Sequence, residues 1–105
     1  MSQFIHPSKD DITLVGIMNA LGDPLRLKIV KSMMNKKQGV SCSQASPCNS
    51  IAKSTLSHHF RILREAGLVR TTKNGVEHCN LLRKDDIEEK FPGLLKAITK
   101  HIDVE

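Results

Sequence analysis

The chain has 105 residues, enough for one modest core, and we expect residues 1–105 to form a single domain. Its 16 lysines and arginines exceed its 11 acidic residues, and the net charge of +5 favours an acidic partner such as a nucleic acid. Trp and Tyr are absent and Phe occurs three times, which argues against RNA and single strands, because proteins that read those stack bases on aromatic rings.

Two further features indicate the cellular compartment. No stretch is typical of a secretory signal or of a membrane span, so we expect no membrane partner. The three cysteines are an odd number, which favours reduced thiols over a disulfide framework. The chain is therefore expected in the cytoplasm.

Two helices are predicted before residue 35. Ser8 and Asp11 resemble a capping box at the start of the first helix, and Gly22 ends it. Asp23 and Pro24 predict the start of the second, with Asp as the N-cap and Pro where its missing N–H costs nothing. The first helix has an apolar stripe, formed by Ile12, Val15, Met18 and Leu21. The second is apolar on more than one face, as in a buried central helix, at Leu25, Leu27, Ile29, Val30, Met33 and Met34.

The segment from Gln38 to Ser50 is small and polar, and it contains Pro47, which would end any helix. A helix-turn-helix arrangement needs a supporting helix in this region. We place a short one between Ser41 and Ser46, with room for another turn around Ile51.

Residues 53–67 predict a helix that is the most informative part of the chain. Ser54 is expected as its N-cap, and Gly67 ends it where a left-handed residue is favoured. The core-facing side is apolar, with Leu56, Phe60 and Leu63 at helical spacing. The opposite side has hydroxyls, an imidazole and guanidinium groups, which a reader of the DNA major groove needs at the start of a helix. This polar side consists of Ser54, Thr55, Ser57, His58 and Arg61, with Arg64 further along.

A β-hairpin is predicted directly after this helix. Residues 68–72 form a strand-like run, Asn74-Gly75 is a strong turn signal, and residues 76–82 would return antiparallel. Arg70 and Lys73 make the hairpin basic. We therefore predict a mainly helical α+β fold, a winged helix-turn-helix with a two-stranded β-hairpin wing. The alternative is a small α+β domain whose hairpin only covers a core.

A final amphipathic helix is predicted near the end of the sequence. Asp85 is expected to cap a short helical turn that runs to Lys90, and Pro92 to lie in the first turn of the final helix. The apolar side of that helix consists of Leu94, Leu95, Ile98 and Ile102. One use for such a helix is to cover the core, but amphipathic first and last helices in so small a domain favour a symmetric homodimer.

Two blocks, LGDPLRLKIV at 21–30 and STLSHHFRILREAGLV at 54–69, followed by the predicted wing, resemble the ArsR/SmtB family of bacterial winged-helix repressors. The resemblance extends over residues 10–102. It implies a dimer with the first and last helices at the interface, and release of operator DNA when an effector binds. The interface would then include Ile12, Val15, Met18, Leu95, Ile98 and Ile102.

The same resemblance implies DNA contacts residue by residue. Base contacts fall on Ser54, Thr55, Ser57 and His58. Contacts with the DNA backbone fall on His59 and Arg61, and wing contacts on Lys73 and Asn74. The chain departs from the family around Pro47, where a regular apolar pattern is missing, so the supporting helix is expected to be short or irregular.

Cysteines and histidines are candidate sensors. Arsenic and soft-metal sensors of the ArsR/SmtB family place thiolates near the supporting helix, the region where Cys42 and Cys48 lie. These two residues would bind a thiophilic metal or metalloid with a third ligand, respond to oxidation, or be inert thiols. Cys79, in the second wing strand, is expected to be a small core residue, and His6 a solvated residue. The other family metal site is disfavoured, because the last helix offers only one histidine, His101.

These features predict a homodimeric, sequence-specific regulator of transcription that binds an inverted-repeat operator in double-stranded DNA and is released by an effector. No enzyme is expected, because the sequence has no Ser/His/Asp set, paired carboxylates or Gly-rich phosphate loop. The neighbouring His58 and His59 would face different ways on a helix. The alternative is a winged-helix module that binds protein and not DNA, but its recognition face would carry acids or large apolar residues.

Overall fold

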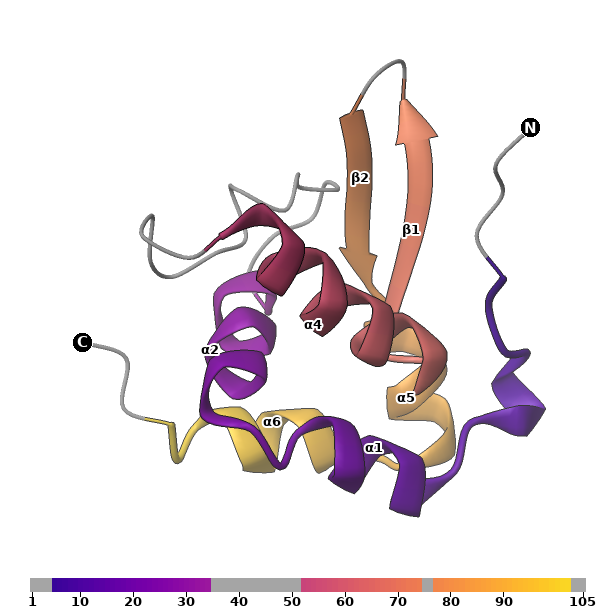
Figure 1. Ribbon diagram of the computed structural model, residues 1–105. Helices are drawn as coiled ribbons and strands as arrows, with labels where there is room; N and C mark the ends of the chain where they lie inside the picture. The colour runs from indigo at the N-terminus through magenta and orange to yellow at the C-terminus, as the bar shows by residue number, and fades with distance from the viewer. Residues whose placement is uncertain (1–4, 35–51, 75–76, 103–105) are drawn as a thin grey trace.

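The computed structural model describes residues 5–34, 52–74 and 77–102. Its elements, labelled as in Figure 1, are η1 (Lys9–Asp11), α1 (Leu14–Ala20), α2 (Pro24–Met33), α4 (Lys53–Glu65), β1 (Val69–Asn74), β2 (Glu77–Leu82), α5 (Lys84–Lys90) and α6 (Leu94–Thr99). The antiparallel hairpin of β1 and β2 extends away from the helices (Figure 1). This mainly helical α+β arrangement, with the hairpin directly after α4, confirms the predicted winged helix-turn-helix fold class.

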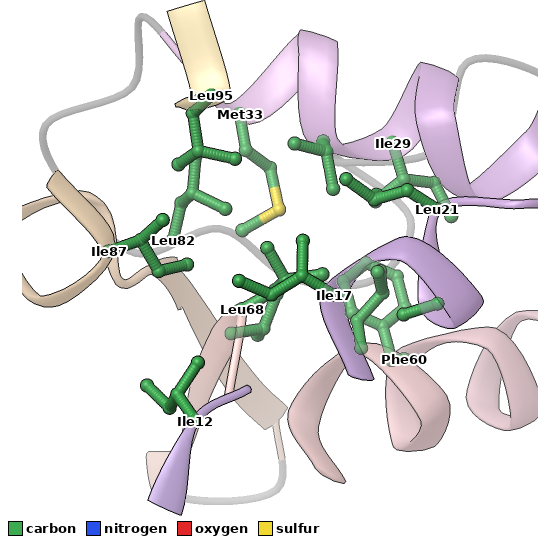
Figure 2. Close-up of a cluster of buried hydrophobic side chains, with 14 of the residues drawn as sticks. Ile12, Ile17, Leu21, Ile29, Met33, Phe60, Leu68, Leu82, Ile87 and Leu95 are labelled. Carbon is green, nitrogen blue, oxygen red and sulfur yellow. The ribbon is translucent and has the colours of Figure 1, made fainter. Parts of the chain in front are cut away.

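The core lies between the helices and the base of the hairpin, and Figure 2 shows its apolar side chains converging from these elements. The predicted inward side of α4 is confirmed, because Leu56, Phe60 and Leu63 are all buried. Helix α2 is central, as predicted, since it contributes buried residues and also packs partly buried leucines against the core. With one side of α4 fixed in this way, its other side is left at the surface.

The start of α2 confirms the prediction made from Asp23 and Pro24. Oδ1 of Asp23 accepts the N–H of Leu25 at 2.8 Å and the N–H of Arg26 at 3.1 Å, and Pro24 occupies the first position of the helix. Burial by itself would raise the pKa of Asp23, but the hydrogen bonds from Arg26 and Leu25 and the charge of Arg26 outweigh it and lower the pKa. The carboxylate that begins α2 is thereby kept ionised.

The predicted first helix is interrupted in the structure. Ser8 begins only the 3-10 turn η1, where its hydroxyl donates to Oδ2 of Asp11 at 3.0 Å. Ile12 is then extended, and α1 follows with Thr13 as the N-cap, whose Oγ1 accepts the N–H of Gly16 at 3.0 Å. The break turns Ile12 into the core, where it is 1% exposed. The expected place of Ile12 on an exposed interface is therefore corrected.

Gly67 ends α4, as predicted, with a φ of +87°. The N–H of Gly67 donates to the carbonyl of Arg64 at 3.1 Å, and the N–H of Leu68 donates to the carbonyl of Leu63 at 3.0 Å. A Cβ on Gly67 would lie 2.5 Å from Cγ1 of Ile12, so both the conformation and the space require glycine. The end of α4 is thus packed directly against the segment that precedes α1.

The hairpin register runs from Val69↔Leu82 to Asn74↔Glu77. Asn74 is therefore the last paired residue of β1, and the predicted turn at Asn74-Gly75 is wrong by one residue, because residues 75–76 separate the two strands. The turn signal correctly indicated a hairpin but not its register, which depends on how the strands pair and pack.

The two faces of the hairpin differ in burial. Thr71 and Asn80 are paired and buried, and Oγ1 of Thr71 donates to Oδ1 of Asn80 at 2.8 Å. Cys79 and Leu81 point to the other face, where Cys79 is half-buried and Leu81 is exposed. Cys79 is therefore not the core residue that was predicted, since neighbouring residues of a strand alternate between faces and Asn80 takes the inner position.

The last two helices begin at other residues than predicted. Arg83 is the residue before α5, so Asp85 lies in the first turn instead of capping it. Gly93, with a φ of +79°, directly precedes α6, which leaves Pro92 outside that helix. The role of Gly93 before α6 is difficult to predict from sequence, because a glycine in a left-handed conformation more commonly follows the end of a helix.

The last helix exposes less apolar surface than predicted. Leu95 is 4% exposed, so its expected place at an interface is corrected to the core of the protomer. Ile98 is half-buried against that core, and Ile102 follows α6 instead of lying in it. On α1, Val15 and Met18 are 69% and 55% exposed, so the predicted outer side of the first helix is at the surface.

Candidate nucleic-acid interface

Helix α4 presents its polar side to the surface. The residues of the predicted base-reading face are all exposed, namely Ser54, Thr55, Ser57 and His58. One detail is corrected: α4 begins at Lys53, so Ser54 lies in its first turn and Ala52 occupies the N-cap. Alanine has no side chain that can cap a helix, and the exposed Ser54, Thr55 and Ser57 lie near this positive end of the helix dipole.

His59 does not share that exposed face. Its Nδ1 lies 3.0 Å from Nη1 of Arg26 on α2, and Nε of Arg26 donates to the carbonyl of Ala20 at 2.6 Å. Because a guanidinium group only donates, we infer that Nδ1 of His59 accepts. The structure thus gives the half-buried His59 a partner on α2, whereas His58 is exposed, and the contact of His59 with the DNA backbone stays a prediction.

Arg61 and Arg64 have different surroundings. Nε of Arg61 lies 3.1 Å from Oε2 of Glu65, and the two side chains are 66% and 62% exposed. An ion pair in water contributes little to stability, so Arg61 can exchange this carboxylate for a phosphate at little cost. Arg64 is half-buried, and its Nη1 donates to Oγ1 of Thr71 at 3.4 Å, which places Arg64 where α4 meets the wing.

The wing also carries exposed basic side chains. Arg70 and Lys73 on β1 are exposed, and Lys73 lies on the same face of the strand as Thr71, two residues earlier. Of Asn74, only the backbone belongs to the described part of the structure. Exposed basic side chains therefore occur on both the helix and the hairpin, as expected of a surface that binds phosphates.

The predicted sensing residues Cys42 and Cys48 lie outside the described residues. His101 is exposed and follows α6. Within residues 5–34, 52–74 and 77–102, no group of three or more His, Cys, Asp or Glu side chains is placed to hold a metal ion. None of the helices in these ranges is both long and apolar enough to cross a membrane.

Two contacts near this surface were missed by the sequence analysis. His6, expected in solvent, accepts the N–H of Thr71 through Nε2 at 2.9 Å, across 65 residues of sequence. Arg26 similarly meets His59 across 33 residues. No local pattern could have indicated either pair, because each partner is an ordinary polar residue within its own segment.

Comparison with known proteins agrees with this geometry. Residues 21–72 match a family model described as a helix-turn-helix domain. The HTH-type transcriptional regulator YceK of Bacillus subtilis is 35% identical over 89 residues, which cover 85% of this chain and 89% of that protein. The chain belongs to the HTH-type transcriptional regulators.

A second regulator of this family, MJ1325 of Methanocaldococcus jannaschii, is 32% identical over 73 residues, which cover 70% of this chain and 81% of that protein. The present HTH-type regulator is therefore a DNA-binding protein of transcription control. The finer resemblance to the ArsR/SmtB family stays a prediction, as do the individual contacts with bases and phosphates.

We predict that Arg61→Ala and His58→Ala weaken DNA binding in different ways. Loss of Arg61 should weaken binding to all duplexes alike, because a phosphate contact carries no sequence information. Loss of His58 should reduce the preference for the regulator's own site over random DNA by about 1–3 kcal/mol, as expected for a base contact. Fluorescence anisotropy with both duplexes measures the two effects.

Lys96→Ala is the matched control for that measurement, since it removes one exposed positive charge from α6. It should change both affinities little. If His58→Ala leaves the ratio of the two affinities unchanged while Arg61→Ala abolishes it, the roles of the two residues have been assigned wrongly.

Proposed function

We propose that the protein is a homodimeric repressor, similar to the ArsR/SmtB family, that binds an inverted-repeat operator and leaves it when an effector binds. The observation that carries this proposal is the exposed side of α4, where hydroxyls and His58 surround the helix start and Arg61 follows one turn later. Such a regulator acts on chromosomal DNA, and we therefore place it in the cytoplasm.

The dimensions of α4 support its insertion into the major groove. Its 13 residues correspond to a helix of about 20 Å, and the major groove, about 12 Å wide, admits one helix. The first turn of α4 would approach base edges with Ser54, Thr55 and Ser57, and the uncapped helix start favours phosphate oxygens beside them. Lys73 on the wing would reach the adjacent backbone.

The alternative, a winged-helix module that binds protein and not DNA, is disfavoured by the same surface. The outward side of α4 has no exposed large apolar side chain, and its single acid, Glu65, is paired with Arg61. Protein interfaces usually bury aromatic or apolar residues at their centre. The charge and polarity of this face match a duplex better.

We expect specific and salt-sensitive binding to the promoter region of the protein's own gene. Two α4 helices in a dimer should read half-sites about 34 Å apart, one turn of DNA. The logarithm of the affinity should fall with the logarithm of the salt concentration, with a slope of about −0.9 for each phosphate neutralised. A mobility-shift assay with scrambled competitor tests this, and equal binding to both DNAs would contradict the proposal.

The proposed dimer interface uses the exposed apolar side of α1. Leu14, Val15 and Met18 are 45%, 69% and 55% exposed, and they form one cluster on a single short helix. In Figure 1, α1 and α6 lie at the end of the molecule away from the tip of the hairpin. A two-fold axis at that end would leave both α4 helices and both wings accessible, and α6, which contains Ile98 and is followed by Ile102, lies at the same end.

Met18→Glu should convert the dimer into monomers, because an isologous interface brings each introduced carboxylate into the apolar contact of the partner. Operator affinity should fall with it, since one half-site alone binds weakly. Sedimentation equilibrium at micromolar concentration measures the oligomeric state. Leu81→Glu, which adds the same charge at an exposed apolar position on the hairpin, should remain dimeric; a monomeric wild type would refute the interface.

The effector of the proposed repressor is a species that reacts with the thiolates of Cys42 and Cys48. Both residues precede α4, the proposed recognition helix, in the chain, so a shared ion or a disulfide would constrain the segment leading into it. Zinc, arsenite or peroxide should therefore release wild-type protein from its operator and release Cys42→Ser/Cys48→Ser protein much less. The same mobility-shift assay decides, and identical release of the two proteins would move the effector site elsewhere.

A further inference from the structure

The N-terminal segment is attached to the wing at the level of His6. Nε2 of His6 accepts the N–H of Thr71 at 2.9 Å, and the next carbonyl, that of Pro7, accepts from Nη1 of Arg83 at 2.8 Å. In Figure 1 the described start of the chain lies on the β1 side of the hairpin, near its base. Two consecutive residues are therefore bound to both arms of the hairpin near its base, one contact on β1 and one at the residue that follows β2.

Thr71 contacts several elements of the candidate nucleic-acid interface at once. Its N–H binds His6, its hydroxyl donates to Oδ1 of Asn80 at 2.8 Å, and the same oxygen accepts from Nη1 of Arg64 at 3.4 Å. Thr71 thus contacts the N-terminal segment, the second strand and the recognition helix. A displacement of β1 at this point would move Lys73, two residues further along the wing.

The contact requires a neutral imidazole. A cationic histidine donates from both ring nitrogens, so it cannot accept the N–H of Thr71. The charged groups that face His6 are Arg70 on β1, Arg64 on α4 and Arg83 before α5, whose guanidinium is paired with Asp86. Partial burial and then the charges of Arg70, Arg83 and Arg64 lower the pKa of His6. These surroundings therefore favour the neutral imidazole, which can accept the N–H of Thr71.

We propose that His6 is a positioning residue for DNA binding, which fixes the wing against the N-terminal segment by accepting the N–H of Thr71 in its neutral form. This inference rests on the proposed contact of the wing with DNA. His6 is distant in sequence from the predicted DNA-contacting residues of α4 and the wing. Its contact makes the position of the wing depend on the protonation of the His6 imidazole.

The direction of the pH dependence follows from the lowered pKa. The contact is complete above the ordinary histidine pKa of 6.5, and it is lost as the pH falls through the lower pKa of folded His6. The contribution of His6 has to be measured against a variant that keeps the acceptor but does not titrate.

The variants His6→Gln and His6→Ala test whether the hydrogen bond accepted from Thr71 is what matters at this position. The amide oxygen of glutamine can take the place of Nε2 but does not titrate, whereas alanine has no acceptor. At pH 7.5, His6→Ala should bind the operator about two- to tenfold more weakly than wild type, and His6→Gln like wild type. As the pH falls below the ordinary histidine pKa of 6.5, wild type should lose a similar factor relative to His6→Gln. His101→Gln, which removes an exposed imidazole after α6, should follow wild type.

Hydrogen exchange of the Thr71 amide in the dimer without DNA gives an independent readout. Exchange should be faster in His6→Ala than in wild type and unchanged in His6→Gln. The inference is overturned if Thr71 exchanges alike in wild type and His6→Ala, or if the affinities of wild type and His6→Gln keep a constant ratio at all pH values. Failure of the proposed operator binding itself would appear differently, as equal affinity of wild type for operator and scrambled DNA.

Discussion

The close approach of Ile12 to Gly67 is the contact on which the arrangement of helix, wing and N-terminal segment depends. Glycine allows α4 to end with a φ of +87° and leaves the space that Ile12 fills. The chain then passes through the buried Leu68 directly into β1. Because the recognition helix and the wing diverge at this point, their relative angle is set by a packed contact and not by a flexible connection.

Part of the positive charge of the chain serves the fold. The ammonium group of Lys90 donates to three carbonyl oxygens around η1, those of Lys9, Asp10 and Ile12, at 3.0, 2.8 and 2.5 Å. The side chain of Arg83 is only 4% exposed, and it donates to the carboxylate of Asp86 and to the carbonyl of Pro7. Lys84 donates to the carbonyl of Met34 at 2.9 Å. Some of the basic residues that enter the net charge of +5 therefore hold the fold together, and the location of the charge matters more than its sum.

Sequence patterns predicted those features that depend on neighbouring residues. The Asp23 cap, the apolar stripe of α4 and the glycine at its end each follow from short-range geometry, and the hairpin signal lay within a few residues of the observed strands. The break before α1, the inward position of His59 and the contact of His6 could not be predicted in this way. Each depends on a partner distant in sequence, namely Gly67, Arg26 and Thr71. For Cys42 and Cys48 the sequence offers only spacing, which leaves several chemistries open.

The buried pair of Thr71 and Asn80 has a consequence for how such a protein can diversify. A polar hydrogen bond between two inward residues penalises any slip of one strand against the other, because a slip would leave both groups buried without each other. The base of the hairpin is thereby kept in one alignment. Over evolutionary time, substitutions of an exposed residue further along β1, such as Lys73, can change how strongly the proposed wing contact holds the DNA backbone without requiring a new scaffold.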